Sequence, residues 1–125
     1  MSTLKDISNA LDFFKKNGFK KKNICVLHCI SDYPAKKDEL NLLAIRLIKN
    51  KFQVKTGYSD HSLGDLASIS AVVLGAEVIE KHITIDKKMI GPDHILSMDK
   101  REFKNFVMSL NDINLILGKK IKKIT

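Results

Sequence analysis

Polar side chains that can bind metal ions or exchange protons follow three short apolar segments of the sequence. They occupy residues 31–34, 59–62 and 80–82, and a fourth group lies in the loop at 91–94. Ligands of parallel α/β folds lie at the carboxyl ends of the strands. If the three apolar segments are parallel strands, their polar endings meet at one edge of the sheet. The sequence therefore predicts a functional site there.

Two histidines are the strongest candidates within this predicted site. His61 and His82 end neighbouring segments, so parallel strands would bring both within reach of one ion. Two imidazoles with oxygen ligands suit a divalent metal such as Mn²⁺, Fe²⁺ or Zn²⁺. Glu80 points to the same side of its strand as His82, two residues later, and could orient a ligand or complete the site.

Each of these residues also has a simpler structural interpretation. A histidine within an apolar strand is commonly a hydrogen-bonded core residue, and a serine before a helix commonly caps it. Under this interpretation the roles are His28 in the core, Tyr33 packed in a turn, Ser59 or Ser62 capping a helix with Asp65, Gly91-Pro92 forming a turn, and Asp93 bridging locally.

The apolar periodicity predicts alternating helices and strands that would position these groups. Thr3 with Asp6 begins a helix that Asn17-Gly18 ends, and Asp99 with Glu102 begins the last helix. The elements between them are a strand at 24–30 expected to be buried on both faces, a helix from Asp38 and Glu39 to Ile48, a strand at 52–58, a helix at 64–74 ended by Gly75, and a strand at 77–84. The last helix is expected to turn Phe103, Phe106, Val107, Leu110, Ile113 and Leu117 inward and to end at Gly118.

Strands joined by helices are parallel, so the sequence predicts an α/β fold. A doubly wound sheet and part of a (β/α)8 barrel both fit this order of elements. A complete barrel takes about 250 residues. The 125 residues can form one domain with a hydrophobic core, and could supply only part of a barrel.

Composition narrows the class of protein. The net charge of +8 comes almost wholly from lysine, as in the run Lys119, Lys120, Lys122 and Lys123, without interleaved aromatic residues for stacking bases. This disfavours nucleic-acid binding. No apolar run could span a membrane and no signal peptide begins the chain, so a cytoplasmic protein is expected. Cys25 and Cys29 would lie roughly 13 Å apart on a strand, too far for a disulfide.

Five motifs occur in an order and at separations that closely resemble those of the N-acetylneuraminate synthase family, which also makes legionaminic and pseudaminic acids. The motifs are Leu27-His28-Cys29-Ile30-Ser31-Asp32-Tyr33-Pro34, Gly57-Tyr58-Ser59-Asp60-His61-Ser62-Leu63-Gly64, Ala71-Val72-Val73-Leu74-Gly75-Ala76, Glu80-Lys81-His82-Ile83-Thr84 and Gly91-Pro92-Asp93-His94. The resemblance covers almost the whole chain.

This resemblance implies a (β/α)8 barrel, of which residues 1–125 would form the C-terminal part, strands six to eight with their helices. Family members carry a further antifreeze-like domain after the barrel and work as domain-swapped dimers. That domain is expected to be absent here. So are the phosphoenolpyruvate-binding lysines, the catalytic glutamates and an arginine from the partner's small domain.

The resemblance also implies roles for individual residues. His61 and His82 match the metal-binding pair, which usually holds Mn²⁺ or Mg²⁺, and Ser59 matches a serine that binds the phosphate of phosphoenolpyruvate. Tyr33 and Asp93 match contacts to the acylamino sugar. Ser31 stands where the best-studied neuraminate synthases carry asparagine. Serine there is compatible with the legionaminate, pseudaminate and animal-type branches, so the sugar stays open.

The implied activity is condensation of phosphoenolpyruvate with N-acetylmannosamine or a related acylamino hexose, giving a nonulosonic acid and phosphate. Two alternatives compete with it. The chain could be an inactive truncated or split part of such an enzyme, whose partner is the missing part of the barrel. Alternatively, His61, His82 and Asp93 could form the two-histidine, one-carboxylate iron site of an oxygenase, which the parallel α/β pattern disfavours.

Overall fold

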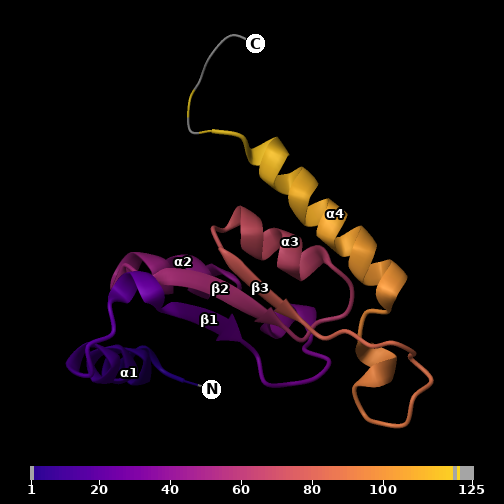
Figure 1. Cartoon of the computed structure of the whole chain (residues 1–125), viewed down its shortest axis with the longest axis horizontal. Helices are drawn as coiled ribbons and strands as arrows, with labels where there is room; N and C mark the ends of the chain where they lie inside the picture. The colour runs from indigo at the N-terminus through magenta and orange to yellow at the C-terminus, as the bar shows by residue number, and fades with distance from the viewer. Residues whose placement is uncertain (1, 120, 122–125) are drawn as a thin grey trace.

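The computed structural model describes residues 2–119 and 121, so Lys120, Lys122 and Lys123 of the C-terminal lysine run lie outside the described residues. Helices and strands alternate along the chain (Figure 1). The order is α1 (Leu4–Lys16), β1 (Cys25–Cys29), α2 (Leu43–Phe52), β2 (Lys55–Asp60), α3 (Leu66–Val73), β3 (Val78–Lys81) and α4 (Lys100–Leu117), with short 3₁₀ helices at Lys21–Asn23, Lys37–Glu39 and His94–Leu96.

The three strands form one parallel sheet in the order β1-β2-β3. Leu27 lies opposite Gly57, which in turn lies opposite Val78. All three strands therefore end at the same edge, and the loops that follow them meet there. The predicted parallel α/β fold is confirmed.

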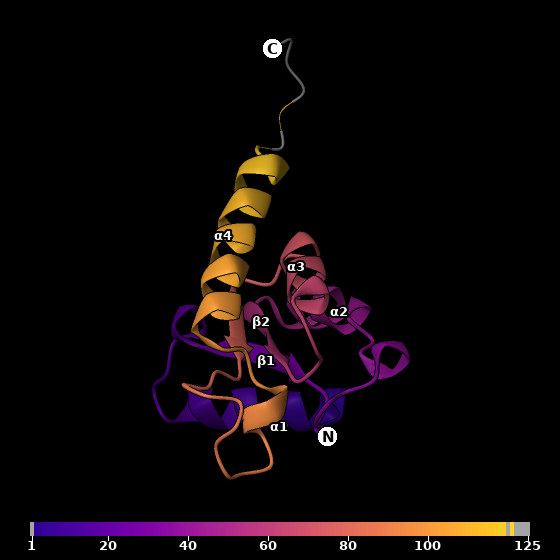
Figure 2. The ribbon, with the colours of Figure 1, turned by 90° about the vertical axis from the view of Figure 1, so that its right-hand side faces the viewer.

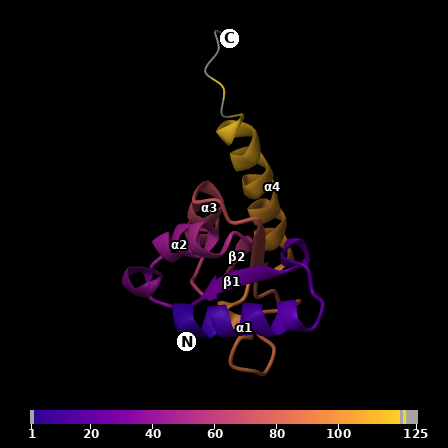
Figure 3. The same ribbon diagram turned by 90° about the vertical axis from the view of Figure 1, so that its left-hand side faces the viewer.

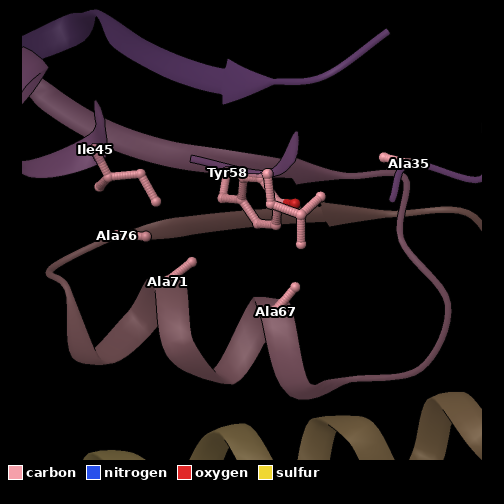
Figure 4. Close-up of a cluster of buried hydrophobic side chains, with 7 residues drawn as sticks. Ala35, Ile45, Tyr58, Ala67, Ala71 and Ala76 are labelled. Carbon is pink, nitrogen blue, oxygen red and sulfur yellow. The ribbon is translucent and has the colours of Figure 1, made fainter. Parts of the chain in front are cut away.

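Helices cover one face of this sheet. Tyr58 is fully buried on that face, where Ile45 of α2 and Ala67 and Ala71 of α3 surround it (Figure 4). A second cluster joins Leu11 of α1 to α2 and to the β1 side of the sheet. Two further views show α1 and α4 at opposite ends of the molecule, with α2 and α3 between them (Figures 2 and 3).

Alternation along the strands assigns the other side chains to the opposite face. Leu27, Gly57 and Val78 share it, because a Cβ atom at Gly57 would touch both of the other residues. Among the described residues no helix covers this face, and Val78 is exposed. We call it the open face of the sheet.

Two predicted helix caps are confirmed. Thr3 and Asp6 form a capping box at α1, and Asp99 and Glu102 form one at α4. In each box the side chain of the first residue accepts a backbone N–H of the first turn, and the acidic side chain accepts the N–H of the cap residue. Both helix starts were therefore legible in the sequence.

Other boundaries were predicted wrongly. The second helix does not begin at Asp38. Residues 37–39 form a separate 3₁₀ turn, and the positive φ of Asn41, 43°, breaks the helical backbone conformation before α2. The second strand does not begin at residue 52, because Phe52 packs in the core as the last residue of α2 and Gln53 ends the helix in the left-handed region.

Burial was also overestimated for two elements. β1 is half-buried throughout, not buried on both faces, since it lies at the edge of the sheet and its second face is open. In α4 Phe106 is buried and Phe103, Leu110 and Ile113 are half-buried, but Val107 and Leu117 are exposed.

Two further expectations concern the cysteines and membrane insertion. Cys25 and Cys29 are both free thiols, as predicted. No helix in the described part of the chain has the length and apolarity needed to cross a bilayer.

Candidate metal and substrate site at the strand ends

The structure brings His61 and His82 together at the carboxyl edge of the sheet. The residues before them, Asp60 and Lys81, are direct partners in the register of β2 and β3. Both histidines therefore leave adjacent strands at the same level. Their ring centroids are 5.2 Å apart with the planes at 84°. Both side chains are half-buried.

Backbone hydrogen bonds hold both histidines in place. The carbonyl of His61 accepts the N–H of Ala35, at 3.0 Å, from the loop after β1. The carbonyl of His82 accepts the N–H of Met98, at 3.1 Å, and Met98 in turn accepts the N–H of Thr84. Each histidine is thus tied to a segment distant in the sequence, so its position is fixed by more than its own strand.

Tyr33 completes an aromatic cluster with the two histidines. Its ring lies 4.2 Å from that of His82 at a tilt of 32°, and 5.2 Å from that of His61, nearly edge-on. The bond between Ala35 and His61 explains this placement, because it draws the loop after β1 towards the end of β2. Tyr33 therefore lies within the candidate site, against both histidine rings.

The Tyr33 hydroxyl is held as a neutral donor. Burial raises its pKa, and the nearby charges of Asp93 and Asp60 raise it further. Ser97 Oγ donates its only proton to the carbonyl of Asp93 at 2.7 Å, so the longer 3.4 Å contact has Tyr33 as donor. This chain links Tyr33 to the loop that carries Asp93.

Ser59 and Glu80 form a second pair on the open face. Ser59 Oγ donates to Glu80 Oε1 at 2.5 Å across the β2–β3 pairing. Ser59 therefore does not cap α3. Ser62 does not cap it either: its hydroxyl donates to Asp60, and the residue at the N-cap is Asp65, whose side chain makes no cap hydrogen bond. The capping interpretation was wrong for both serines.

The remaining candidates are placed differently. His28 is the satisfied core residue of the simpler interpretation: its Nε2 donates to the carbonyl of Leu40 at 2.8 Å, and its ring stacks on Tyr58. Asp93 is exposed, and its backbone carbonyl accepts Ser97 and Leu96. Ser31 is exposed and borders a hollow between α1, β1 and α2.

The donor set fits a divalent ion as two of its ligands. Two imidazoles this close can each approach one ion at about 2.1 Å, and their nitrogens suit Mn²⁺, Fe²⁺ or Zn²⁺ better than Mg²⁺. Within residues 2–119 and 121, no three His, Cys, Asp or Glu side chains gather closely enough to hold an ion. The alternative iron site of His61, His82 and Asp93 is therefore not formed in the described chain.

Sequence reasoning missed three residues that touch or support the site. Cys29, the last residue of β1, places its Sγ 3.9–4.0 Å from both ring nitrogens of His61. Asp60 and Lys81 form a buried ion pair directly before the histidines. The signal was present: two opposite charges stand at matching positions at the ends of successive apolar segments.

Comparison with known proteins gives a consistent result. The sequence model described as the NeuB family matches residues 1–122. The N,N'-diacetyllegionaminic acid synthase of Campylobacter jejuni is 46% identical over 123 residues, covering 98% of this chain and 37% of that protein. The protein of the same name from Legionella pneumophila is 49% identical over 100 residues, covering 80% and 28%.

A solved structure, the N-acetylneuraminic acid synthetase of Leptospira borgpetersenii in complex with citrate, superposes with a TM-score of 0.90 at 36% identity. It covers 100% of this chain, which covers 43% of that one. The chain thus spans about a third of the length of the curated relatives it matches. The predicted fold, a segment of a TIM barrel, is confirmed by this match.

Proposed function

The chain belongs to the NeuB family, and from that premise we propose that it forms the metal- and sugar-binding part of a nonulosonic acid synthase. The proposed reaction joins phosphoenolpyruvate to the aldehyde carbon of an open-chain acylamino hexose. The observation that carries this proposal is the pair His61 and His82, whose rings meet at the carboxyl edge of a parallel sheet.

His61 and His82 are proposed to hold one divalent ion, Mn²⁺ in preference to Mg²⁺ because imidazole suits transition metals. Such an ion would supply Lewis-acid polarisation of the aldehyde oxygen. Tyr33 lies against both rings, and its neutral hydroxyl can donate to a sugar oxygen. Asp93, close enough for its charge to act on that hydroxyl, is proposed to accept from the sugar. Together they would hold the aldehyde in attack geometry.

Ser59 is proposed to bind the phosphate of phosphoenolpyruvate. Its single proton is donated to Glu80 in the structure, and a phosphate oxygen can only accept. Ser59 must therefore turn its hydroxyl away from Glu80 when it binds the phosphate. In this proposal Glu80 accepts the Ser59 proton while no phosphate is bound, and it does not complete the metal site.

After the enol carbon of phosphoenolpyruvate attacks the aldehyde carbon, water adds to the resulting cationic carbon, and phosphate leaves with cleavage of its C–O bond. We expect the residues that bind and activate the remaining parts of phosphoenolpyruvate to lie in the portion of the relatives that this chain does not match. We therefore propose that the 125 residues alone do not catalyse the condensation, and that the active form includes the rest of the barrel. We also propose that this enzyme works in the cytoplasm.

The product proposed is a legionaminic-type acid, since the two relatives compared above carry that name at 46–49% identity. A related acylamino hexose would then be preferred over N-acetylmannosamine. Ser31, exposed at the border of a hollow, does not narrow the choice of sugar further.

A chimera tests the proposal. The matching 123 residues of the Campylobacter legionaminic acid synthase are replaced by this chain. Phosphate release from phosphoenolpyruvate is then measured with Mn²⁺ and either N-acetylmannosamine or the acylamino hexose that gives a legionaminic-type acid. We expect turnover by the chimera, none by the His61→Ala/His82→Ala chimera, and none by the 125-residue chain alone. A folded chimera without activity, or turnover unaffected by loss of both histidines, would contradict the proposal.

A further inference from the structure

A buried ion pair lies directly behind the two histidines. Lys81 Nζ is 3.0 Å from Asp60 Oδ2, and the two side chains are 5% and 0% exposed. Asp60 is the last residue of β2 and Lys81 the last of β3, and they are partners in the register of the sheet. The pair thus joins the two strands at the level where the chain passes to His61 and His82.

The Asp60 carboxylate is fully used by its surroundings. Oδ1 accepts the backbone N–H of Ser62 at 2.8 Å and its hydroxyl at 2.7 Å, and Oδ2 accepts the hydroxyl of Ser68 at 2.5 Å together with Lys81. Each carboxylate oxygen thus accepts at least two donors, as its two lone pairs allow. A buried network that is complete in this way holds its members in one geometry.

The same network encloses His61. Asp60 precedes this histidine and Ser62 follows it, and Ser62 uses its N–H, its hydroxyl and its carbonyl within the network, the last as acceptor from Lys81. The backbone of His61 is therefore bridged from both sides. The ammonium group of Lys81 contacts both Asp60 and the carbonyl of Ser62, and Lys81 directly precedes His82 in the sequence.

Stability alone is a weak reason for such a pair. Removing two charges from water is costly, and apolar residues of similar volume often serve a fold equally well. What an apolar pair cannot supply is a directional link between two strand ends. Residues that orient metal ligands from behind commonly change metal affinity by about 10–100-fold when they are replaced.

We propose that Asp60 and Lys81 are positioning residues, which fix the ends of β2 and β3 so that the His61 and His82 rings converge on one divalent ion. The metal part of this inference rests on the proposed function, whereas the convergence of the rings does not.

The test compares matched double variants of the full chain. Asp60→Asn/Lys81→Met removes both charges together and keeps the side-chain volumes, so that no buried charge is left unpaired. As the control, Lys49→Met/Glu77→Gln removes the exposed ion pair, 3.0 Å long, between α2 and the residue that precedes β3. Mn²⁺ affinity is measured by calorimetry, and ring proximity without metal is measured as the NOE between the imidazole protons of His61 and His82.

We expect the Asp60/Lys81 variant to lose Mn²⁺ affinity about 10–100-fold and to lose the NOE, while the control variant retains both. A cooperatively folded Asp60/Lys81 variant with unchanged affinity and unchanged NOE would overturn the proposal and leave the pair a purely structural one. If that variant does not fold, Ser62→Ala decides, because it deletes one hydrogen bond of Asp60 and spares the ion pair. It should weaken Mn²⁺ binding severalfold, and unchanged affinity and NOE would overturn the proposal.

The two proposals fail differently. A wild-type chain that binds no Mn²⁺ but shows the NOE, with the NOE lost in the Asp60/Lys81 variant, would refute the metal site and support the positioning role. Mn²⁺ binding that depends on His61 and His82 but not on the ion pair would support the metal site and refute the positioning role.

Discussion

Gly57→Ala should separate β2 from its neighbours, because the space at this position is already filled. A Cβ atom there would lie 2.4 Å from Leu27 Cδ2 and 2.4 Å from the backbone oxygen of Val78. Real Cβ atoms essentially never approach other heavy atoms closer than 3.0 Å, so each neighbour must move by at least 0.6 Å. The Leu27 side chain can rotate away, but the Val78 oxygen belongs to β3 and can move only with that strand.

The size of the effect follows from two opposing contributions. Overpacking of this kind costs about 1–3 kcal/mol. Replacing glycine by alanine restricts the unfolded chain and returns about 0.4–1 kcal/mol. The central values of these two ranges leave a net loss of unfolding free energy of about 1.3 kcal/mol, which corresponds to a fall in Tm of roughly 4–8 °C for a domain of this size. Because β3 must shift, the distance between His61 and His82 should change as well.

Urea unfolding followed by far-UV circular dichroism measures the stability, and Mn²⁺ calorimetry measures the site. Gly64→Ala is the matched control: its Cβ would meet nothing within 4 Å, but its φ of +77° is strained for alanine. We expect it to cost about 1–2 kcal/mol with unchanged Mn²⁺ affinity. Adding Leu27→Ala should rescue Gly57→Ala only partly. Complete rescue would refute the inference that the Val78 backbone is the limiting contact.

Three further perturbations test the core and the last helix. Thr56→Val should stabilise the chain by about 1 kcal/mol, since the buried Thr56 Oγ1 has no hydrogen-bond partner among the described residues; a lower Tm would contradict this. Ile45→Ala, at a fully buried position, should cost about 2–5 kcal/mol in urea unfolding, and a cost below about 1 kcal/mol would show that α2 does not pack as described. Acid should loosen α4: Lys87 and the backbone N–H of Asp99 lower the pKa of Glu102 from 4.5, and the backbone N–H groups of Glu102 and Arg101 lower that of Asp99 from 3.8. A carboxyl whose pKa is lowered by folding stabilises the fold at any pH above its unfolded-state pKa, and this contribution is lost as the pH falls through its folded-state pKa. Helical circular dichroism should therefore decline below about pH 4, and less steeply in Glu102→Gln; an identical decline in both proteins would contradict the assignment.

Sequence patterns were reliable where one local interaction decides the structure. The capping boxes at Thr3 and Asp99 and the alternation of helices with apolar strands each follow from a few neighbouring residues. The meeting of His61 and His82 also followed, because parallel strands end at one edge whatever their exact limits.

Other features depend on contacts between distant segments. From its neighbours in the sequence Phe52 is predicted to begin a strand, but in the structure it ends α2 and packs in the core with Leu11 and Ile48. Ser62 reads as a helix cap until the Asp60 carboxylate is found beside it. The burial of Asp60 with Lys81 depends on register and on α3, neither of which periodicity specifies. The roles of Ser31, Tyr33, Ser59 and Asp93 towards substrates remain predictions.

Mn²⁺ binding by the histidine pair tests the central claim most directly. The wild-type chain is titrated with Mn²⁺ by calorimetry beside His61→Ala, His82→Ala and, as a control, His28→Gln. His28 bonds to Leu40 and stacks on Tyr58, away from the pair. We predict one bound ion per chain, lost in either of the first two variants and retained in the control. Equal Mn²⁺ affinity in the wild type and in folded His61→Ala and His82→Ala would contradict the assignment of this corner as the metal site.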